Sequence, residues 1–183
     1  MKPVTAPNNQ RSWLFNCGAR LRLRFSTISC CLRTRFSAIT ALDVRQDIKV
    51  NRTASIYETD PLINQDQPLF LNTVVELSTA LDPEEMLQVC KGIELMLGRP
   101  ETHEKYAPRV IDLDILAYET KMVELSHLII PHTGIFSRKF VLVPWAELAS
   151  EFTVQGAGKT VSELLLLCPD TSNVRMHHLE KTA

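Results

Sequence analysis

Hydrophobic and polar residues recur with regular periods along most of the chain after residue 35. Apolar residues at helical spacing predict helices, whereas alternation or short β-branched runs predict strands. The predicted helices are 35–45, 82–97, 144–149 and 164–167, and the predicted strands are 48–56, 70–79, 110–116 and 140–143. Helices and strands therefore mix along the chain, with hairpin-like segments toward its end. This order predicts an α+β fold with a mainly antiparallel sheet.

The clearest helix boundaries belong to the segment that starts at Asp82. Asp82 suits the N-cap, and Pro83 suits the first helical position, where no backbone N–H is needed. Gly98 suits the end of the helix because glycine adopts the left-handed conformation without strain. Glu94 lies near the edge of the apolar stripe, where its carboxylate either reaches water or is held by a cation. The polar segment 99–108 then predicts either a mobile lid or an ordinary connection.

Two aspartates interrupt the apolar strand predicted at 110–116. Residues two apart on a strand project to the same face, so Asp112 and Asp114 are expected side by side, roughly 6–7 Å apart at the backbone. Carboxylates this close repel each other unless a cation lies between them, and hard oxygen ligands suit Mg²⁺. Arg109 precedes the strand and carries the planar guanidinium that binds phosphate. The spacing alone also allows two solvated acids on an open face, so both interpretations stay open at this point.

Composition narrows the class of protein. The 183 residues are 45% hydrophobic, which is enough for one domain with a core, and no apolar run approaches the length of a membrane span. The net charge of −1 hides an asymmetry, because residues 1–42 carry seven basic residues and no acid. The rest carries 13 basic and 21 acidic residues, and an acidic domain is a poor binder of nucleic acid. The five cysteines have neither zinc spacing nor an even count, which indicates reduced thiols.

The basic N-terminal segment 1–34 differs from the rest of the chain. Its composition is typical of a mitochondrial transit peptide, and it also fits a disordered tail or a miscalled exon. These interpretations place the domain at 35–170 and a C-terminal tail at 171–183. The alternation of Leu21 and Leu23 with arginines also allows a native strand, which is the least favoured interpretation here.

A longer pattern surrounds the two aspartates. From Lys105 to Leu116 the chain has a basic residue, a spacer, a small residue, Pro-Arg, two apolar residues, Asp-Leu-Asp and two aliphatic residues. This run resembles the signature of the 6-hydroxymethyl-7,8-dihydropterin pyrophosphokinases of folate synthesis, and further matches extend from Ile48 to Leu166. The resemblance implies a ferredoxin-like α+β sandwich. It also implies pyrophosphate transfer from ATP to the pterin hydroxymethyl group, with release of AMP and with two Mg²⁺ ions bridging the phosphates.

The resemblance also implies roles for single residues. It implies metal ligands at Asp112 and Asp114, and catalytic phosphate-binding arginines at Arg99 and Arg109. It implies that ATP contacts Glu94, Arg99, Arg109, Ile115, His132 and Arg138. It implies that the pterin contacts Thr59, Pro61, Leu62, Phe70, Asn72 and Phe140, with the two phenylalanines stacking on the ring and Asn72 offering both a donor and an acceptor.

The chain departs from the family pattern in its first part and in its lid. The family opens with a strand followed by Gly-Ser-Asn, and residues 1–47 contain no such run. Glu101 and Thr102 stand where many members carry basic residues, which puts the affinity for ATP or the closure of the lid in doubt. Tyr106 and Thr133 replace a frequent tryptophan and a frequent tyrosine. A missing first strand is expected to leave the edge of a neighbouring strand exposed.

Three hypotheses about function follow. The first is an active Mg²⁺-dependent pyrophosphokinase that acts as a monomer on ATP and the pterin, with no nucleic-acid or membrane partner. The second is a non-catalytic pterin- or nucleotide-binding relic that lost turnover with its first strand. The third is an unrelated metal-dependent phosphohydrolase, for which the chain offers no dedicated base. The expected location is the cytoplasm, or the mitochondrial matrix if residues 1–34 are a transit peptide.

Overall fold

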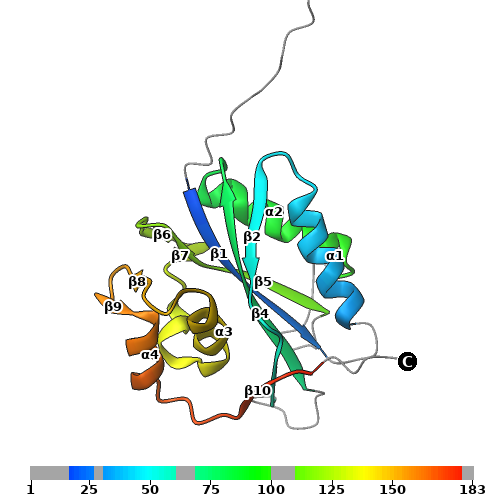
Figure 1. Ribbon diagram of the computed structural model, residues 1–183. Coiled ribbons are helices and arrows are strands. Elements are labelled where there is room, and N and C mark those ends of the chain that lie inside the picture. Colours follow the sequence, from blue (N-terminus) through cyan, green and yellow to red (C-terminus); the bar gives the residue numbers. More distant parts are fainter. Residues whose placement is uncertain (1–16, 27–30, 61–68, 100–109, 179–183) are drawn as a thin grey trace, which may run out of the picture.

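The computed structural model describes residues 17–26, 31–60, 69–99 and 110–178 (Figure 1). The expected lid at 99–108 and the site residues Pro61, Leu62 and Arg109 therefore lie largely or wholly outside the described residues. Within the described residues, helices and antiparallel strands mix as the sequence predicts. The predicted α+β class is confirmed.

One antiparallel sheet organises the domain. In the described part of the chain it has six strands in the order β10-β3-β4-β1-β5, with β2 also paired to β4. Their bounds are β1 (Cys17–Ser26), β2 (Ile48–Thr53), β3 (Tyr57–Thr59), β4 (Phe70–Thr79), β5 (Ile111–Tyr118) and β10 (Val174–Met176). β2 and β3 pair with successive parts of the same side of β4. Counted as one broken strand, they complete the βαββαβ order of a ferredoxin-like sandwich.

Helices cover both faces of this sheet (Figure 1). On one face lie α1 (Cys31–Asp43) and α2 (Pro83–Met96), and on the other lie α3 (Lys139–Ala149) and α4 (Val161–Leu167). The remaining elements are the hairpin of β6 (Val123–Leu125) and β7 (Leu128–Ile130), the 3₁₀ helix η1 (Thr133–Ser137), and the hairpin of β8 (Thr153–Val154) and β9 (Lys159–Thr160). Each face has its own apolar cluster, as expected for a sheet buried on both sides.

The predicted boundaries of α2 are confirmed. The Asp82 carboxylate accepts a hydrogen bond from the Glu85 N–H at 2.8 Å, and the Glu85 carboxylate accepts one from the Asp82 N–H at 2.8 Å. This reciprocal capping box satisfies two N–H groups that the first turn cannot pair. Gly98 follows the helix with a φ of 93°, a conformation that side-chain-bearing residues rarely adopt. Local hydrogen bonding therefore sets both ends of α2.

The expectation that residues 1–34 lie outside the domain is wrong for two elements. β1 lies between β4 and β5, and Leu21 and Leu23 are fully buried against α1 and α2. α1 begins at Cys31, before the predicted boundary at residue 35. The acid-free composition indicated a tail, but a strand in the middle of a sheet needs only alternating apolar residues on its covered face. Whether residues 1–34 also include a transit peptide or a miscalled segment stays a prediction.

Two further predictions need correction. Residues 140–143 are not a strand but the first part of α3. A short apolar run fits either structure, and this helix is buried on most sides, at Phe140, Val141, Leu142, Pro144 and Trp145, so the run shows no helical period. The C-terminal tail expected at 171–183 contains β10, which pairs with β3 from Val174 opposite Thr59 to Met176 opposite Tyr57. Pairing with an exposed sheet edge, rather than local propensity, orders these three residues.

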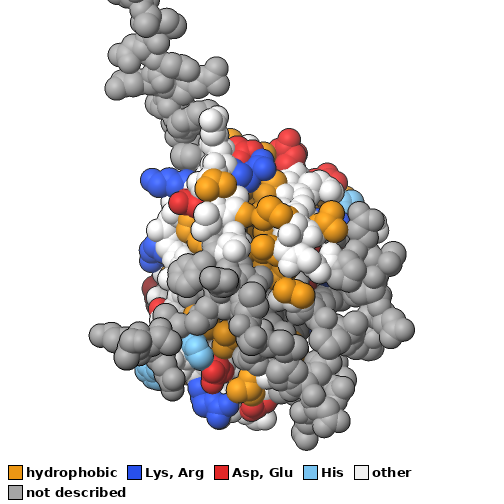
Figure 2. All heavy atoms as spheres, turned by 90° about the vertical axis from the view of Figure 1, so that its right-hand side faces the viewer, with side chains coloured by type: hydrophobic (Ala, Val, Ile, Leu, Met, Phe, Trp, Pro, Cys, Tyr) orange, Lys and Arg blue, Asp and Glu red, His pale blue; other side chains and the backbone are white. Residues whose placement is uncertain are grey.

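The surface mixes apolar and charged side chains. Figure 2 shows the side of the molecule at the right of Figure 1, where hydrophobic side chains form a discontinuous band among polar and charged ones. Single exposed apolar side chains such as Val44, Leu95 and Met96 are normal on a protein surface. No helix in the described ranges is both long and apolar enough to cross a membrane.

Candidate active site

The two aspartates lie on β5, as the sequence predicts. Ile111, Leu113 and Ile115 are buried in the cluster beneath α1 and α2. Asp112 and Asp114 alternate with them and remain partly exposed on the opposite face. The period of two along a strand thus separates the residues that hold the core from those available for chemistry.

A buried ion-pair cluster joins α2 to β5. The Arg99 Nη1 lies 2.5 Å from the Glu94 Oε2 and donates a hydrogen bond to the Asp112 Oδ1 at 3.1 Å. The exposed fractions of these side chains are 18% for Arg99, 8% for Glu94 and 16% for Asp112. Of the two interpretations of Glu94, the carboxylate held by a cation is the correct one. A guanidinium between two carboxylates offsets the repulsion that they would otherwise feel.

Glu94 also binds the backbone between the two aspartates. Its Oε1 accepts a hydrogen bond from the Leu113 N–H at 2.7 Å. β5 is the last strand on its side of the sheet among the described residues, so this N–H has no strand partner there. Burial raises the pKa of the Glu94 carboxyl, against the lowering effects of the Leu113 N–H and the Arg99 guanidinium. Glu94 therefore fixes the strand edge from which both aspartates project.

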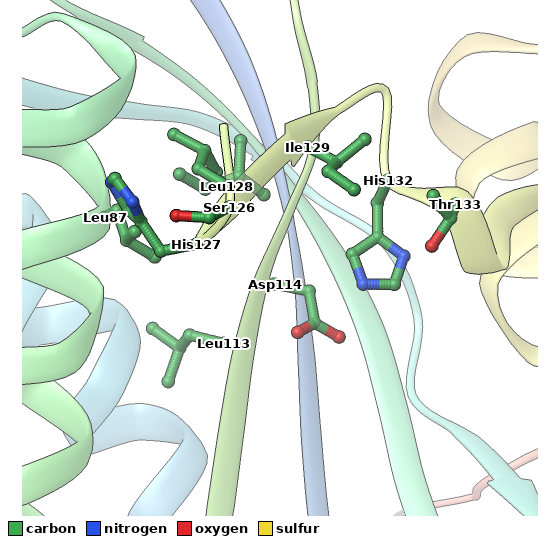
Figure 3. Close-up of a pocket in the computed structure, with 10 residues that line it drawn as sticks. Leu87, Leu113, Asp114, Ser126, His127, Leu128, Ile129, His132 and Thr133 are labelled. Carbon is green, nitrogen blue, oxygen red and sulfur yellow. The ribbon is translucent and has the colours of Figure 1, made fainter. Parts of the chain in front are cut away.

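A pocket of about 290 Å³ lies beside Asp114. Its walls come from α2, β5, the β6–β7 hairpin and the start of η1, through Leu87, Leu113, Asp114, Ile115, Ser126, His127, Leu128, Ile129, His132 and Thr133. Figure 3 shows the Asp114 carboxylate and the His132 ring facing each other across this space. Apolar walls with a few convergent polar groups are typical of a site for a small molecule.

The His132 ring is held in one orientation. Its Nδ1 accepts a hydrogen bond from the Gly134 N–H at 3.0 Å, and its own backbone N–H donates to the Leu116 carbonyl at 3.0 Å. Because Nδ1 is the acceptor, Nε2 carries the ring proton. The Arg138 guanidinium packs so closely on Gly134 that a Cβ there would lie 2.7 Å from its Cζ. Gly134 is therefore needed for Arg138 to lie beside the His132 turn.

A second polar group lies on β4 and β3. The Asn72 Nδ2 donates a hydrogen bond to the Thr59 Oγ1 at 3.0 Å, and both residues are buried. The Asn72 Oδ1 is also buried and accepts no hydrogen bond from any residue in the described ranges. Since a buried polar atom without a partner costs free energy, this oxygen is a candidate acceptor for a ligand N–H. Phe70 on β4 and Phe140 on α3 are both buried.

The register of the sheet aligns the two polar groups. Asn72 on β4 and Asp112 on β5 are both Cα partners of Arg24 on β1. They therefore stand in one row, on one face, two strand spacings or about 10 Å apart. The structure therefore places Asn72, which the sequence assigns to the pterin, and Asp112, which it assigns to the metal, on the same face of the sheet with β1 between them.

The sequence did not assign several residues that line the pocket. Ser126 and His127 lie in the turn of the β6–β7 hairpin, and Leu87 lies on α2. His127 also approaches the Glu84 carboxylate at 3.2 Å. No local pattern marks these residues, because only the docking of the hairpin beside α2 brings them to Asp114.

Comparison with known proteins identifies the family. Residues 27–150 match the sequence model of 7,8-dihydro-6-hydroxymethylpterin-pyrophosphokinase (HPPK). The chain is 41% identical over 128 residues to a 2-amino-4-hydroxy-6-hydroxymethyldihydropteridine pyrophosphokinase of Methylorubrum extorquens, a match that covers 70% of this chain and 79% of that protein. It is 42% identical over 115 residues to the protein of the same name from Bacillus subtilis. This match covers 62% of this chain and 68% of that protein.

Solved structures agree at the level of the fold. A wild-type HPPK-DHPS structure of Plasmodium falciparum superposes with a TM-score of 0.64 at 15% identity, over 82% of this chain. The match spans only 44% of that chain, so this protein corresponds to less than half of it. The family match starts at residue 27, directly after β1, although β1 occupies the middle of the sheet. The extent and identity of the sequence matches nevertheless show that the chain belongs to the 7,8-dihydro-6-hydroxymethylpterin-pyrophosphokinase family.

Proposed function

We propose that this chain transfers pyrophosphate from ATP to the hydroxymethyl group of 6-hydroxymethyl-7,8-dihydropterin, with AMP as the second product, in the synthesis of folate. One observation carries the proposal: two carboxylates project from β5, one of them into a pocket and the other onto a largely buried arginine. Asp114 faces His132 across the pocket, while Asp112 pairs with Arg99. Carboxylates that can hold a cation, together with the Arg99 guanidinium, suit a reaction in which the negative charge of a polyphosphate must be neutralised.

Asp112 and Asp114 are the proposed ligands of Mg²⁺, with two ions by analogy with the family. Their hard oxygens fit Mg²⁺, which typically takes one or two carboxylates and fills its other positions with water and substrate phosphates. When bound, Mg²⁺ offsets the negative charge of the phosphates. Arg99 and Arg109 add positive charge from the protein, since guanidinium stays protonated at any working pH.

The nucleotide is proposed to occupy the pocket beside Asp114. His132 and Ile115 line it, and Arg138 packs on the turn that holds His132. Glu94 is proposed to support nucleotide binding indirectly, because it pairs with Arg99 and accepts a hydrogen bond from the Leu113 N–H on β5. The Nε2–H of His132 is then a donor for a phosphate or base acceptor. Fixed side chains of this kind lower the barrier by holding the reacting groups in place.

The pterin is proposed to lie two strands away, beside Asn72 on β4. The Asn72 Oδ1 offers an acceptor to an N–H of the ring, and the Asn72 Nδ2 is held by Thr59. Phe70 and Phe140 supply flat apolar surface for stacking, and Pro61 and Leu62 are expected to line the same side. The separation of about 10 Å between Asn72 and Asp112 along their shared row leaves room for the ring and its hydroxymethyl arm.

We also propose that the chain acts as a monomer in a reducing compartment, the cytoplasm or the mitochondrial matrix. Cys90 is fully buried and free, and burial raises the pKa of its thiol, with the charges of Glu94 and Asp114 acting in the same direction. A thiol held in its protonated form is a poor nucleophile, so Cys90 serves as a packing residue and not as a disulfide partner.

Analysis of the products tests the proposed reaction. The purified chain is incubated with Mg²⁺, ATP and the pterin, and the products are separated by chromatography with mass detection. Equal amounts of AMP and pterin diphosphate are expected, without ADP or free inorganic phosphate. Release of phosphate without pterin diphosphate would instead indicate a phosphohydrolase.

A non-catalytic relic remains the second candidate, since no Gly-Ser-Asn follows β1 in the sequence. The presence of β1 removes one argument for it, because the first strand is not lost. Fluorescence titration of the pterin with a non-hydrolysable ATP analogue distinguishes the two. Tight binding without any AMP in the product assay supports the relic and contradicts the proposed reaction.

A further inference from the structure

The Glu147 carboxylate on α3 makes four hydrogen bonds to one segment far away in the sequence. The Ser55 N–H lies 3.0 Å from both of its oxygens, and the Ser55 hydroxyl donates to Oε1 at 2.9 Å. The Tyr57 hydroxyl donates to Oε2 at 3.0 Å. Ser55 lies two residues before β3, and Tyr57 is the first residue of that strand. A single carboxylate therefore fastens α3 to the start of β3.

The two elements that Glu147 joins carry, or lie beside, residues assigned to the proposed pterin pocket. Phe140 lies two helical turns before Glu147 on α3, so both side chains project from the same side of the helix. On β3, Tyr57 is the register partner of Asn72, and Thr59 accepts the hydrogen bond from the Asn72 amide. The distance between Phe140 and the Asn72–Thr59 pair therefore depends on how α3 sits against β3.

Apolar packing alone leaves this position adjustable. The buried Val141, Leu142 and Trp145 hold α3 on the sheet, but apolar contacts are not directional. Hydrogen bonds to a carboxylate are short and directional, and they are stronger than bonds between neutral groups. Tyr57 is buried, and its burial and then its bond to Glu147 raise the pKa of its hydroxyl to about 12, so it remains a donor at neutral pH.

We propose that Glu147 is a positioning residue for the pterin pocket, which sets Phe140 over the Asn72–Thr59 pair by fixing α3 to β3. This inference rests on the proposed function, since it concerns the pterin site of that reaction. Glu147 touches no reacting atom, so its loss changes the fit of the pterin and not the chemistry of transfer. Glu147 is not among the residues that line the nucleotide pocket, and its hydrogen bonds within the described ranges go to Ser55 and Tyr57.

Steady-state kinetics and binding of Glu147→Gln test the proposal, because Gln keeps the size but removes the charge and one acceptor. We expect the pterin Kd and the KM for the pterin to rise about tenfold, which corresponds to about 1.4 kcal/mol. The KM for ATP and kcat at saturating pterin should stay within about twofold of the wild type. Glu151→Gln is the matched control, since Glu151 lies four residues further, is exposed and accepts a hydrogen bond from the Ser150 hydroxyl at 3.2 Å.

Tyr57→Phe is a milder variant that still tests the proposal if Glu147→Gln does not fold. Tyr57→Phe removes a single hydrogen bond and is expected to raise the pterin Kd about threefold, with Asn72 and Thr59 left in place. If Glu147→Gln does not fold, the result with Tyr57→Phe decides. An unchanged pterin Kd in a folded variant, even with a lowered melting temperature, overturns the proposal and makes Glu147 purely structural. A wild-type chain that binds no pterin overturns the proposed function and this inference with it.

Discussion

The Arg99 guanidinium donates a hydrogen bond to the Asp112 carboxylate at 3.1 Å, so a proposed phosphate-binding residue is paired with a proposed metal ligand. Both side chains are largely buried, which strengthens the interaction relative to an ion pair in water. A cation that binds Asp112 must therefore compete with Arg99. If Mg²⁺ were held by Asp112, the Arg99 guanidinium would be available to pair with the phosphates instead.

This competition predicts the behaviour of Arg99→Gln. Without the guanidinium, the negative charges of Glu94 and Asp112 repel each other, and a metal ion is the remaining source of positive charge. We expect Mg²⁺ to bind about tenfold more tightly in the absence of ATP, since a hydrogen bond to a charged group is worth about 1.5–3 kcal/mol. Turnover should fall. Titration with Mn²⁺, followed by electron paramagnetic resonance, measures the affinity for a divalent ion directly.

A matched control for this experiment is Arg52→Gln. Arg52 pairs with the Glu76 carboxylate at 2.9 Å on the opposite part of the sheet and is half exposed. Arg52→Gln should leave the affinity for divalent metal ions unchanged. Equal affinity for Mn²⁺ in Arg99→Gln and in the wild type would show that Arg99 does not compete with the metal.

Removing either proposed metal ligand should abolish turnover while the protein still folds. Asp112→Asn or Asp114→Asn removes one anionic oxygen ligand, and metal-ion catalysis contributes several kcal/mol, so a loss of more than about 100-fold is expected. Binding of the pterin alone should change much less. The AMP assay measures turnover, and Glu124→Gln on β6 is the control for loss of an exposed acid. Near-normal turnover in either aspartate variant would rule out the metal assignment.

The two buried phenylalanines should contribute to pterin affinity. Phe140→Ala or Phe70→Ala is expected to weaken pterin binding by about 1–3 kcal/mol through lost stacking and lost burial. Because Phe140 also belongs to the core cluster beside α3, its variant should be less stable and must be titrated well below its melting temperature. Fluorescence titration provides the affinity. Phe136→Ala, at an exposed position in η1, is the control. If all three variants bind the pterin alike, the phenylalanines are only core.

The buried leucines of β1 make the N-terminal segment essential for stability. Leu23→Ala is expected to cost about 2–5 kcal/mol of unfolding free energy, because it leaves a cavity in the middle of the sheet. Leu167→Ala, with a side chain 65% exposed at the end of α4, should cost less than about 0.5 kcal/mol. Urea denaturation measures both. Deletion of 1–34 should then unfold the protein, contrary to what its tail-like composition predicts. A stable deletion variant would mean that β1 does not form.

Glu94 should make stability fall as the pH rises above about 4.5. Burial raises the pKa of this carboxyl in the folded chain above its ordinary 4.5, so the folded protein holds the proton more tightly than the unfolded chain. Its stabilising contribution is fully present below pH 4.5 and is lost as the pH rises through the folded pKa. Glu94→Gln should remove this loss. The free energy of unfolding in urea, measured from pH 3.5 to 7, provides the comparison.

Glu163 should change the stability with pH in the opposite direction to Glu94. The Thr160 N–H and hydroxyl lower the pKa of the Glu163 carboxyl in its capping box. Its contribution is present above pH 4.5 and is lost as the pH falls through the lowered folded pKa. Glu163→Gln should therefore lose stability mainly at neutral pH. If Glu94→Gln shows the same pH dependence as Glu163→Gln, the direction inferred for Glu94 is wrong.

Local patterns in the sequence determined the parts of the fold that depend on near neighbours. The alternation around Asp112 and Asp114 predicted both their strand and their common face, because strand periodicity needs only residues two apart. The capping box at Asp82 and the glycine at position 98 predicted the ends of α2, because both act within one turn. The family signature, from Lys105 to Leu116, is likewise a short stretch and includes both aspartates.

Only the tertiary structure decided which distant segments meet. β1 looked like part of a tail because its composition was read alone, yet its leucines fill the middle of the sheet and its register sets Asn72 in line with Asp112. The apolar run at 140–143 fits a strand or a helix, and it forms the start of α3, which is buried on most sides. The bonds from Glu147 to Ser55 join residues 92 positions apart. Such contacts depend on register and shared burial across the whole domain, and no local periodicity encodes them.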